Sequence, residues 1–259
     1  MLHFIVLIFG FTGILGKLIS LEAERLVFWR VFLGGGLVAF WLLFRRKTER
    51  FPWKVWVKVA LVGCAAAAHW IAFFGSIKAS NVSVALATLA TTPVFVSVLE
   101  PLVHRRKMDW RELLLGGVII VGLLVLLWGP SEGDFALTSD QYYRGIGLAL
   151  ISAALAAVFS IFNSVLVRTY DSSNLTRVEL LSAAGVLAVL FLVDGRGRAL
   201  EFWAIPKEDW LWLALLASLA TAFAFLMSIE VMKRLSPYHS SCDQHGTGLC
   251  HCSCRLDFR

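Results

Sequence analysis

The chain has 259 residues and a formal net charge of +6, and its composition is 58% hydrophobic but only 16% charged. Soluble domains carry about 25% charged residues, so a soluble globular domain is excluded because too few charged side chains are present to cover its surface. The basic excess does not indicate a nucleic-acid partner either, because Lys and Arg cluster in the connections between long apolar runs. The composition predicts an all-α polytopic membrane protein whose partner is the lipid bilayer.

Eight apolar runs are long enough to be membrane spans, since about 20 helical residues at ~1.5 Å each cross ~30 Å of hydrocarbon. The first run has neither a basic leader nor a small-x-small cleavage site, so we interpret it as a span and not as a signal peptide. No composition shift before residue 238 marks a separate soluble domain. The predicted spans are residues 2–19, 26–44, 55–77, 82–103, 112–129, 145–167, 177–193 and 210–232.

The distribution of Lys and Arg predicts how the chain is oriented in the membrane. If the N-terminus is cytoplasmic, 14 Lys and Arg residues belong to the inner side and eight to the outer side. Positive residues accumulate on the cytoplasmic side, so we expect a multi-pass protein of the cell's inner (plasma) membrane with a cytoplasmic N-terminus. Lys17 and Arg30 are counted on the outer side because we expect both to lie near span ends and to snorkel to the interface.

The third span contains the first candidate site residues. His69 lies inside this apolar run, and imidazole is the side chain that titrates near neutral pH. It is a candidate for proton coupling or substrate contact, and the alternative is a histidine that donates a hydrogen bond to a carbonyl of a neighbouring helix. Trp70 and Phe73 are candidates for the aromatic wall of a cavity, with plain packing as the alternative.

The fourth span contains a threonine pair followed by proline. Pro93 removes one backbone hydrogen bond of the helix, and the hydroxyl of Thr91 or Thr92 can bond to the carbonyl that is left free. A helix broken at this point exposes polar backbone to a binding cavity, or it simply bends. Both interpretations stay open, and all three residues are candidates for substrate contact.

A faint internal repeat relates residues 77–82 to residues 232–237, each at the end of an apolar run. Five spans are an odd number, so two five-span copies would be inverted in the membrane. This is a recurrent transporter architecture with its substrate site near the midplane. Two complete copies need ten spans, and only eight are present.

The composition changes after Tyr238. Residues 239–259 contain four of the five cysteines and three of the six histidines. The Cys-x-Cys-x-Cys spacing does not match the paired ligands of structural zinc sites, so we predict no metal site. A reading one base out of frame permits an apolar segment with a central Glu-Pro, and we therefore interpret residues 239–259 as an out-of-frame tail.

Three stretches of the chain resemble the drug/metabolite transporter superfamily, in particular the EamA-type ten-helix transporters. They are GFTGILGKLISLEAERLVFWR, HWIAFFGSIKASNVSVALATL and MKRLSPY. The resemblance implies a first five-helix repeat over residues 1–129, and an incomplete second repeat of three helices over residues 145–238. It also implies export of a small metabolite, such as an amino acid or a related compound, by alternating access. By family analogy the coupling ion is the proton, and Asn163 and Glu179 face the cavity.

No HExxH, GxSxG or P-loop motif is present in the sequence. We therefore predict a secondary-active transporter of a small molecule, and neither an enzyme nor a cofactor-binding protein. The alternative is a non-transporting membrane subunit or an inactive truncated remnant, and a third interpretation is an intramembrane transferase that depends on Glu179 or Glu230. The sequence leaves a homodimer open.

Overall fold

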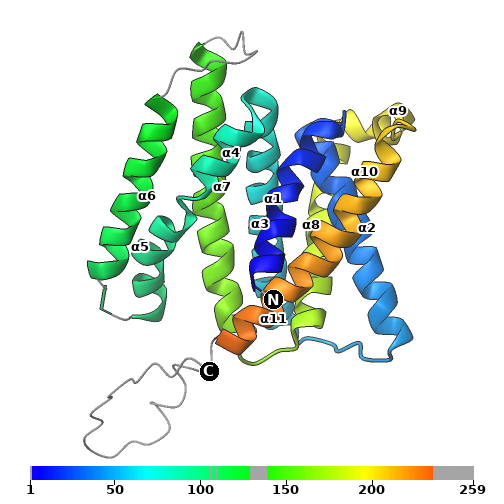
Figure 1. The fold of residues 1–259 in the computed structure, drawn as a ribbon. Helices are drawn as coiled ribbons and strands as arrows, with labels where there is room; N and C mark the ends of the chain where they lie inside the picture. Colours follow the sequence, from blue (N-terminus) through cyan, green and yellow to red (C-terminus); the bar gives the residue numbers. More distant parts are fainter. Residues whose placement is uncertain (1, 106, 109, 129–138, 236–259) are drawn as a thin grey trace, which may run out of the picture.

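A computed structural model describes residues 2–105, 107–108, 110–128 and 139–235 (Figure 1). In this part of the chain every regular element is a helix. Each of the eight predicted spans is found as a helix or as a short succession of helices, which confirms the predicted all-α fold. The proposed out-of-frame tail, residues 239–259, lies outside the described residues.

The first five predicted spans correspond to six helices. These are α1 (Leu2–Leu18), α2 (Ala23–Phe44), α3 (Trp53–Ala79), α4 (Val82–Leu89), α5 (Thr92–His104) and α6 (Trp110–Trp128). Asn81 explains where α4 begins, because its Oδ1 accepts a hydrogen bond of 2.8 Å from the Val84 N–H. The fourth predicted span is two helices and not one, since α5 begins again directly before Pro93, which lies in its first turn.

The remaining three predicted spans correspond to α7, α8 and a composite third helix. Asp171 caps α8, because one of its carboxylate oxygens accepts hydrogen bonds of 3.1 Å from two backbone N–H groups of the first turn. The last predicted span is α10, η2 and α11 in direct succession, and η2 is a π-helical segment. The elements are α7 (Ser139–Leu166), α8 (Ser172–Val193), η1 (Arg196–Arg198), α9 (Leu200–Trp203), α10 (Asp209–Leu215), η2 (Leu216–Phe223) and α11 (Ala224–Leu235).

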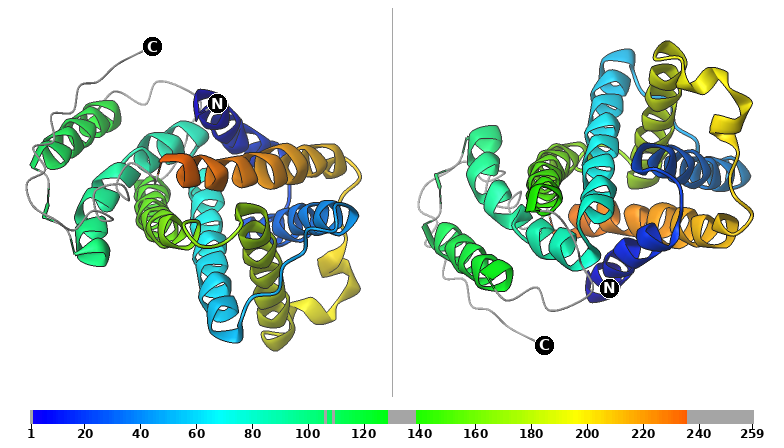
Figure 2. Two further views of the ribbon diagram at one scale, coloured as in Figure 1. Left: turned by 90° about the horizontal axis from the view of Figure 1, so that it is seen from below. Right: turned by 90° about the horizontal axis from the view of Figure 1, so that it is seen from above.

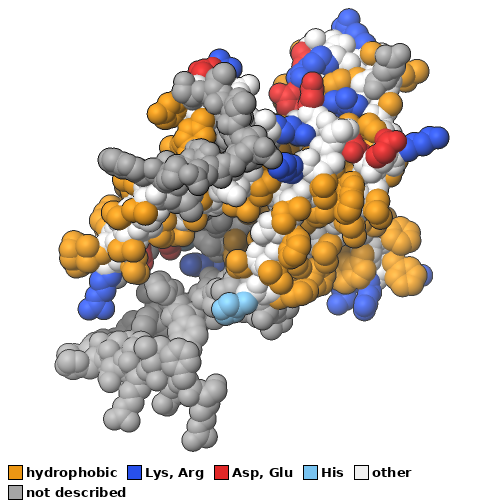
Figure 3. All heavy atoms as spheres, turned by 45° about the horizontal axis from the view of Figure 1, so that its top comes forward, with side chains coloured by type: hydrophobic (Ala, Val, Ile, Leu, Met, Phe, Trp, Pro, Cys, Tyr) orange, Lys and Arg blue, Asp and Glu red, His pale blue; other side chains and the backbone are white. Residues whose placement is uncertain are grey.

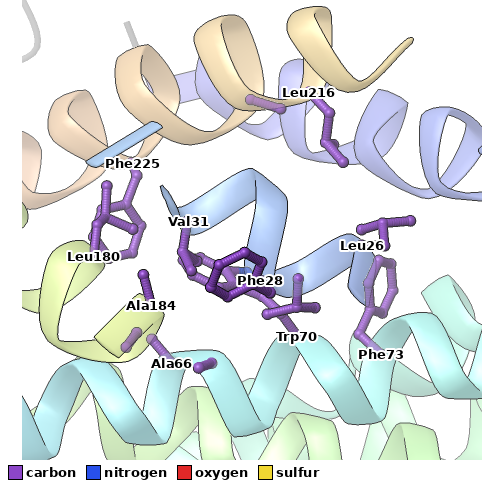
Figure 4. Packing of buried hydrophobic residues seen from close by; sticks show 14 of the residues in the cluster. Leu26, Phe28, Val31, Ala66, Trp70, Phe73, Leu180, Ala184, Leu216 and Phe225 are labelled. Atoms are coloured by element: carbon purple, nitrogen blue, oxygen red, sulfur yellow. The ribbon is translucent and has the colours of Figure 1, made fainter. Parts of the chain in front are cut away.

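The helices form one bundle, and α2 lies on the opposite side of it from α6 (Figure 2). α3 packs against α7 and α8, and α2 packs against α8 and η2. The two views along the bundle show α6 at the outside, next to α5 (Figure 2). The core is built where buried side chains of α2 meet those of α3, η2 and α11, with Val31, Trp70 and Phe225 among them (Figure 4).

The outer surface is apolar over the middle of the bundle, and charged side chains gather toward its ends (Figure 3). Within the described residues, six helices or helix successions have the length and composition of membrane spans, and α1 contributes a shorter apolar helix, His3–Leu18. Apolar side chains that would be costly to expose to water are suited to hydrocarbon. The six spans are Ala23–Phe44, Trp53–Ala79, Val82–His104, Asp140–Leu166, Ser172–Val193 and Asp209–Met232.

Candidate functional site

A cavity of about 220 Å³ lies inside the bundle, between α1, α2, α3, α7 and α11, with the α4–α5 break at one side. Residues of α3 at positions i, i+3, i+4 and i+7 line it, namely Ala66, His69, Trp70 and Phe73. This spacing places them on one face of the helix. Phe225 reaches the same space from α11, opposite the α3 face (Figure 4).

His69 is fixed to α7 through one ring nitrogen. Its Nδ1 lies 2.9 Å from the Ser152 carbonyl oxygen and 2.8 Å from Ser152 Oγ, and that hydroxyl donates to the His69 carbonyl oxygen at 3.0 Å. Because the Ser152 proton is directed to the His69 carbonyl, this arrangement suits a proton on Nδ1 and makes Nε2 the acceptor atom of the ring. The histidine therefore donates to a neighbouring helix, which was one of the two alternatives, and it also lines the cavity.

Arg30 lines the cavity from α2, and the prediction that it snorkels to the interface is wrong. Its side chain is 1% exposed, because α2 begins at Ala23 and places Arg30 about two turns inside the helix. The guanidinium carbon lies 4.3 Å from the centroid of the Trp70 ring and 5.4 Å from that of Phe74. Cation–π contacts of this kind are strongest where water is excluded.

The π-helical segment η2 holds the arginine. Arg30 Nε donates a hydrogen bond of 3.0 Å to Thr221 Oγ1, and Thr221 Oγ1 donates at 2.8 Å to the Leu216 carbonyl five residues earlier. Helices α2 and η2 approach closely at Gly34, where an added Cβ would lie 2.8 Å from the Thr221 side chain. π-Helical turns occur frequently at functional sites, and here the turn positions a hydroxyl against the only arginine that lines the cavity among the described residues.

The chain is broken between α4 and α5, which is one of the two interpretations that the sequence left open. Thr92 Oγ1 donates a hydrogen bond of 2.7 Å to the Leu89 carbonyl, which is the acceptor that Pro93 cannot use. Thr91 Oγ1 donates at 2.7 Å to the Thr88 carbonyl. Thr92 lines the cavity, whereas Thr91 and Pro93 do not.

Asn163 on α7 and Glu179 on α8 are enclosed away from the cavity. Asn163 is 0% exposed and Glu179 is 1% exposed. The Asn163 amide is close enough to act on the Glu179 carboxylate as a hydrogen-bond partner, yet no hydrogen bond of ordinary geometry reaches its side-chain atoms or either Glu179 oxygen. Helix α3 passes very close to Glu179, because an added Cβ at Gly63 would lie 2.7 Å from the Glu179 Cα.

The bundle is tied together at the end where α1 and α3 finish and α10 begins (Figure 1). Asp209 is 2% exposed and accepts hydrogen bonds from Ser20, at 3.1 Å from the backbone N–H and 2.6 Å from the hydroxyl. Lys78 Nζ donates at 3.0 Å to the Ile19 carbonyl. These contacts join α1 to α10 and to α3 at this end of the bundle.

The structure brings half of the sequence-predicted site residues together on the cavity wall: His69, Trp70, Phe73 and Thr92. Thr91, Pro93, Asn163 and Glu179 lie elsewhere. Sequence reasoning missed Arg30 as a wall residue, although a signal was present, because a charged residue inside an apolar span marks a functional site by default.

Comparisons with known proteins agree with this architecture. Residues 1–128 and 143–242 match the EamA-like transporter family. The chain is 24% identical over 235 residues to the "Uncharacterized transporter YxxF" of Bacillus subtilis (strain 168), which covers 89% of this chain and 72% of that protein. A solved structure described as "Crystal structure of protein" shares the fold, with a TM-score of 0.63 and 17% identity over 89% of this chain and 77% of that one. The chain therefore belongs to the EamA-like transporter family and is a multi-pass membrane transporter.

Proposed function

We propose that the chain is a secondary-active exporter of a small metabolite, such as an amino acid or a related compound, and that the cavity is its substrate site. The observation that carries this proposal is the composition of the cavity wall. Helices α1 to α5 come from the first family-matched stretch, and α7 and α11 come from the second. Motion of one stretch against the other would open such a cavity to one side of the membrane and then to the other.

The moving parts in this proposal are the two predicted repeats, residues 1–129 and 145–238, inverted relative to each other. The hydrogen bonds between Ser20 and Asp209 support it, because they join α1 of the first part to α10 of the second at one end of the bundle. Exposure of the cavity toward this end requires these bonds to separate. The cluster is thus suited to be the closed gate of one of the two states.

Proton coupling is assigned to His69. It is the only imidazole among the described residues that line the cavity, a group that in water titrates near neutral pH, and its ring is held at Nδ1 while it faces the substrate space. A change of charge on this ring would be felt by a substrate in the same cavity and by Arg30, which lines the cavity as well.

A cytoplasmic N-terminus in the cell's inner (plasma) membrane completes the proposal. The buried position of Arg30 removes this residue from the outer-side count, so that 14 Lys and Arg residues on the inner side stand against seven on the outer side. The excess on the proposed cytoplasmic side is therefore larger than the sequence alone indicated.

The test is efflux from proteoliposomes that contain the purified full chain and an equimolar mixture of the twenty standard amino acids, with mass spectrometry of the released compounds. We expect selective efflux, and a proton gradient directed into the proteoliposomes should accelerate it. Ala156→Trp, which fills the cavity from α7, should abolish it. Ile151→Trp on the same helix is the matched control, since Ile151 is 54% exposed on the outer surface and should tolerate the change. Equal efflux from both variants would contradict the cavity as the substrate site.

A further inference from the structure

Arg30 is a buried cation without a counter-charge. Within the described part of the chain, no carboxylate forms an ion pair with it, and no Asp or Glu lines the cavity. Its Nη1 has no hydrogen-bond partner. A buried charge that is neither paired nor fully hydrogen-bonded is costly to keep in a fold, so the position calls for an anion that is brought from outside.

The contacts that hold Arg30 leave the Nη1 atom of its guanidinium for a ligand. The Nε–H is used by Thr221, and one face of the planar group lies over the Trp70 ring. The hydrogen bond and the ring together fix the plane of the guanidinium before any ligand arrives. A pre-organised guanidinium of this kind matches the two oxygens of a carboxylate.

The other polar groups of the wall include no negative charge that could balance a cationic ligand. The hydroxyls of Thr12, Thr92 and Ser228 donate their protons to carbonyls three or four residues earlier on their own helices. They can accept a hydrogen bond from a ligand, but they carry no charge to balance an ammonium group. His69 and Ser160 are neutral polar residues of the wall, and its remaining residues are apolar and largely aromatic, including Phe73 and Phe225.

We propose that the substrate of this cavity is an organic monocarboxylate, whose carboxylate pairs with Arg30 and whose apolar body packs on the aromatic wall. One guanidinium balances one negative charge, so a dianionic phosphate is a poorer match than a carboxylate. The amino group of an amino acid is not needed for recognition, because no acidic side chain faces it. This inference rests on the proposed function, since it names the substrate class for the same cavity.

The test measures binding directly, by isothermal titration calorimetry of the full chain in lipid nanodiscs. The probes are 3-phenylpropionate, which has a carboxylate and an aromatic body, and 2-phenylethylamine, which has the aromatic body and an ammonium. The wild-type chain should bind the acid at least about tenfold more tightly than the amine, as expected for charge-assisted hydrogen bonds. Equal affinities for the two probes, or no binding of the acid, would overturn the inference.

Arg30→Gln should weaken binding of 3-phenylpropionate by about tenfold to hundredfold and leave the amine unchanged or bound more tightly. Arg25→Gln is the matched control, because Arg25 lies on the same helix but donates to the Ala204 carbonyl at the exposed end of the bundle. Equal affinity of the two variants for the acid would refute the role of Arg30. Should Arg30→Gln fail to fold, the comparison of acid and amine on the wild-type chain decides the question.

Transport separates this inference from the proposed function. If the acid binds through Arg30 but neither the amino acids nor 3-phenylpropionate, loaded into the same proteoliposomes, is exported, the proposed function fails and the carboxylate site stands. If compounds are transported while binding of the acid is independent of Arg30, the carboxylate site fails and the proposed function stands.

Discussion

Two close helix crossings of this apolar bundle each lie beside a buried charged side chain, and they leave these two side chains in opposite states. At Gly34, α2 meets η2, and the nearby Arg30 is hydrogen-bonded to Thr221 and borders a cavity. At Gly63, α3 meets α8, and Glu179 is enclosed with neither carboxylate oxygen hydrogen-bonded. Both crossings depend on a missing side chain, because small residues let helix backbones approach in a membrane protein.

The two crossings differ in whether their polar group can bind a solute. A polar group that is held by one hydrogen bond and borders a cavity can bind a solute without a large rearrangement of the protein. A polar pair that is enclosed and unsatisfied destabilises the folded state and is not reachable by a solute without opening the bundle. We therefore assign substrate contact to the Arg30 crossing, and we regard the Asn163–Glu179 pair as a separate feature of the interior.

The largest expected effect is that of Gly63→Ala on stability. The new methyl group would meet the backbone of Glu179, which cannot move without shifting α8, so we expect a loss near the upper end of the ~1–3 kcal/mol typical of overpacking. Gly34→Ala meets first a methyl group of Thr221 and should cost only about 1 kcal/mol. Denaturation in mixed micelles measures the free energy of unfolding of both variants. A larger loss for Gly34→Ala than for Gly63→Ala would contradict this prediction.

The second prediction concerns coupling. His69→Gln should remove the response of transport to a proton gradient, since it replaces a titratable ring on the cavity wall with a neutral amide. Glu179→Gln, at the enclosed site, should leave this response in place. The measurement is efflux from proteoliposomes with and without the gradient. A response that survives in His69→Gln but disappears in Glu179→Gln would transfer the coupling role to the second crossing.

A third prediction tests whether the enclosed pair is unsatisfied in the folded protein. Asn163→Leu should raise the free energy of unfolding by about 1–2 kcal/mol, because it removes buried polar atoms that have no hydrogen bond. Ser152→Ala should lower it by about 1 kcal/mol, because that hydroxyl contacts both Nδ1 and the carbonyl oxygen of His69. If Asn163→Leu is destabilising, the amide makes a contact in the membrane that compensates for its burial.

The smallest effect is expected at the α4–α5 break. Thr92→Val should cost about 1 kcal/mol, since it leaves the Leu89 carbonyl without the hydroxyl that replaces the bond lost at Pro93. Thr91→Val should cost less, because the Thr88 carbonyl also accepts from the Thr91 backbone N–H at 3.0 Å. Thermal unfolding of the two variants, measured side by side, compares the two losses of stability. Equal losses would show that the Leu89 carbonyl left free by Pro93 does not depend on the Thr92 hydroxyl.

Most of the fold could be predicted because it follows from local properties of the chain. The lengths of the apolar runs specify the spans, and the α4–α5 break follows from the missing N–H of Pro93. The part of the cavity wall that α3 contributes could also be predicted, since His69, Trp70 and Phe73 are close in sequence and share one helix face. Arg30 was misplaced because its depth depends on where α2 begins, and Ala23 precedes the predicted start of that span by three residues.

The sequence by itself determined that this protein is a bundle of membrane helices with polar groups at a few interior positions, because hydrophobic length and periodicity are properties of single segments. Only the tertiary structure decided which of those groups share a space. Arg30 and Thr221 are 191 residues apart, and Asn163 lies on a different helix from Glu179. Whether such groups line a cavity or become enclosed depends on how closely whole helices cross, and that distance is set by the packing of the assembled bundle.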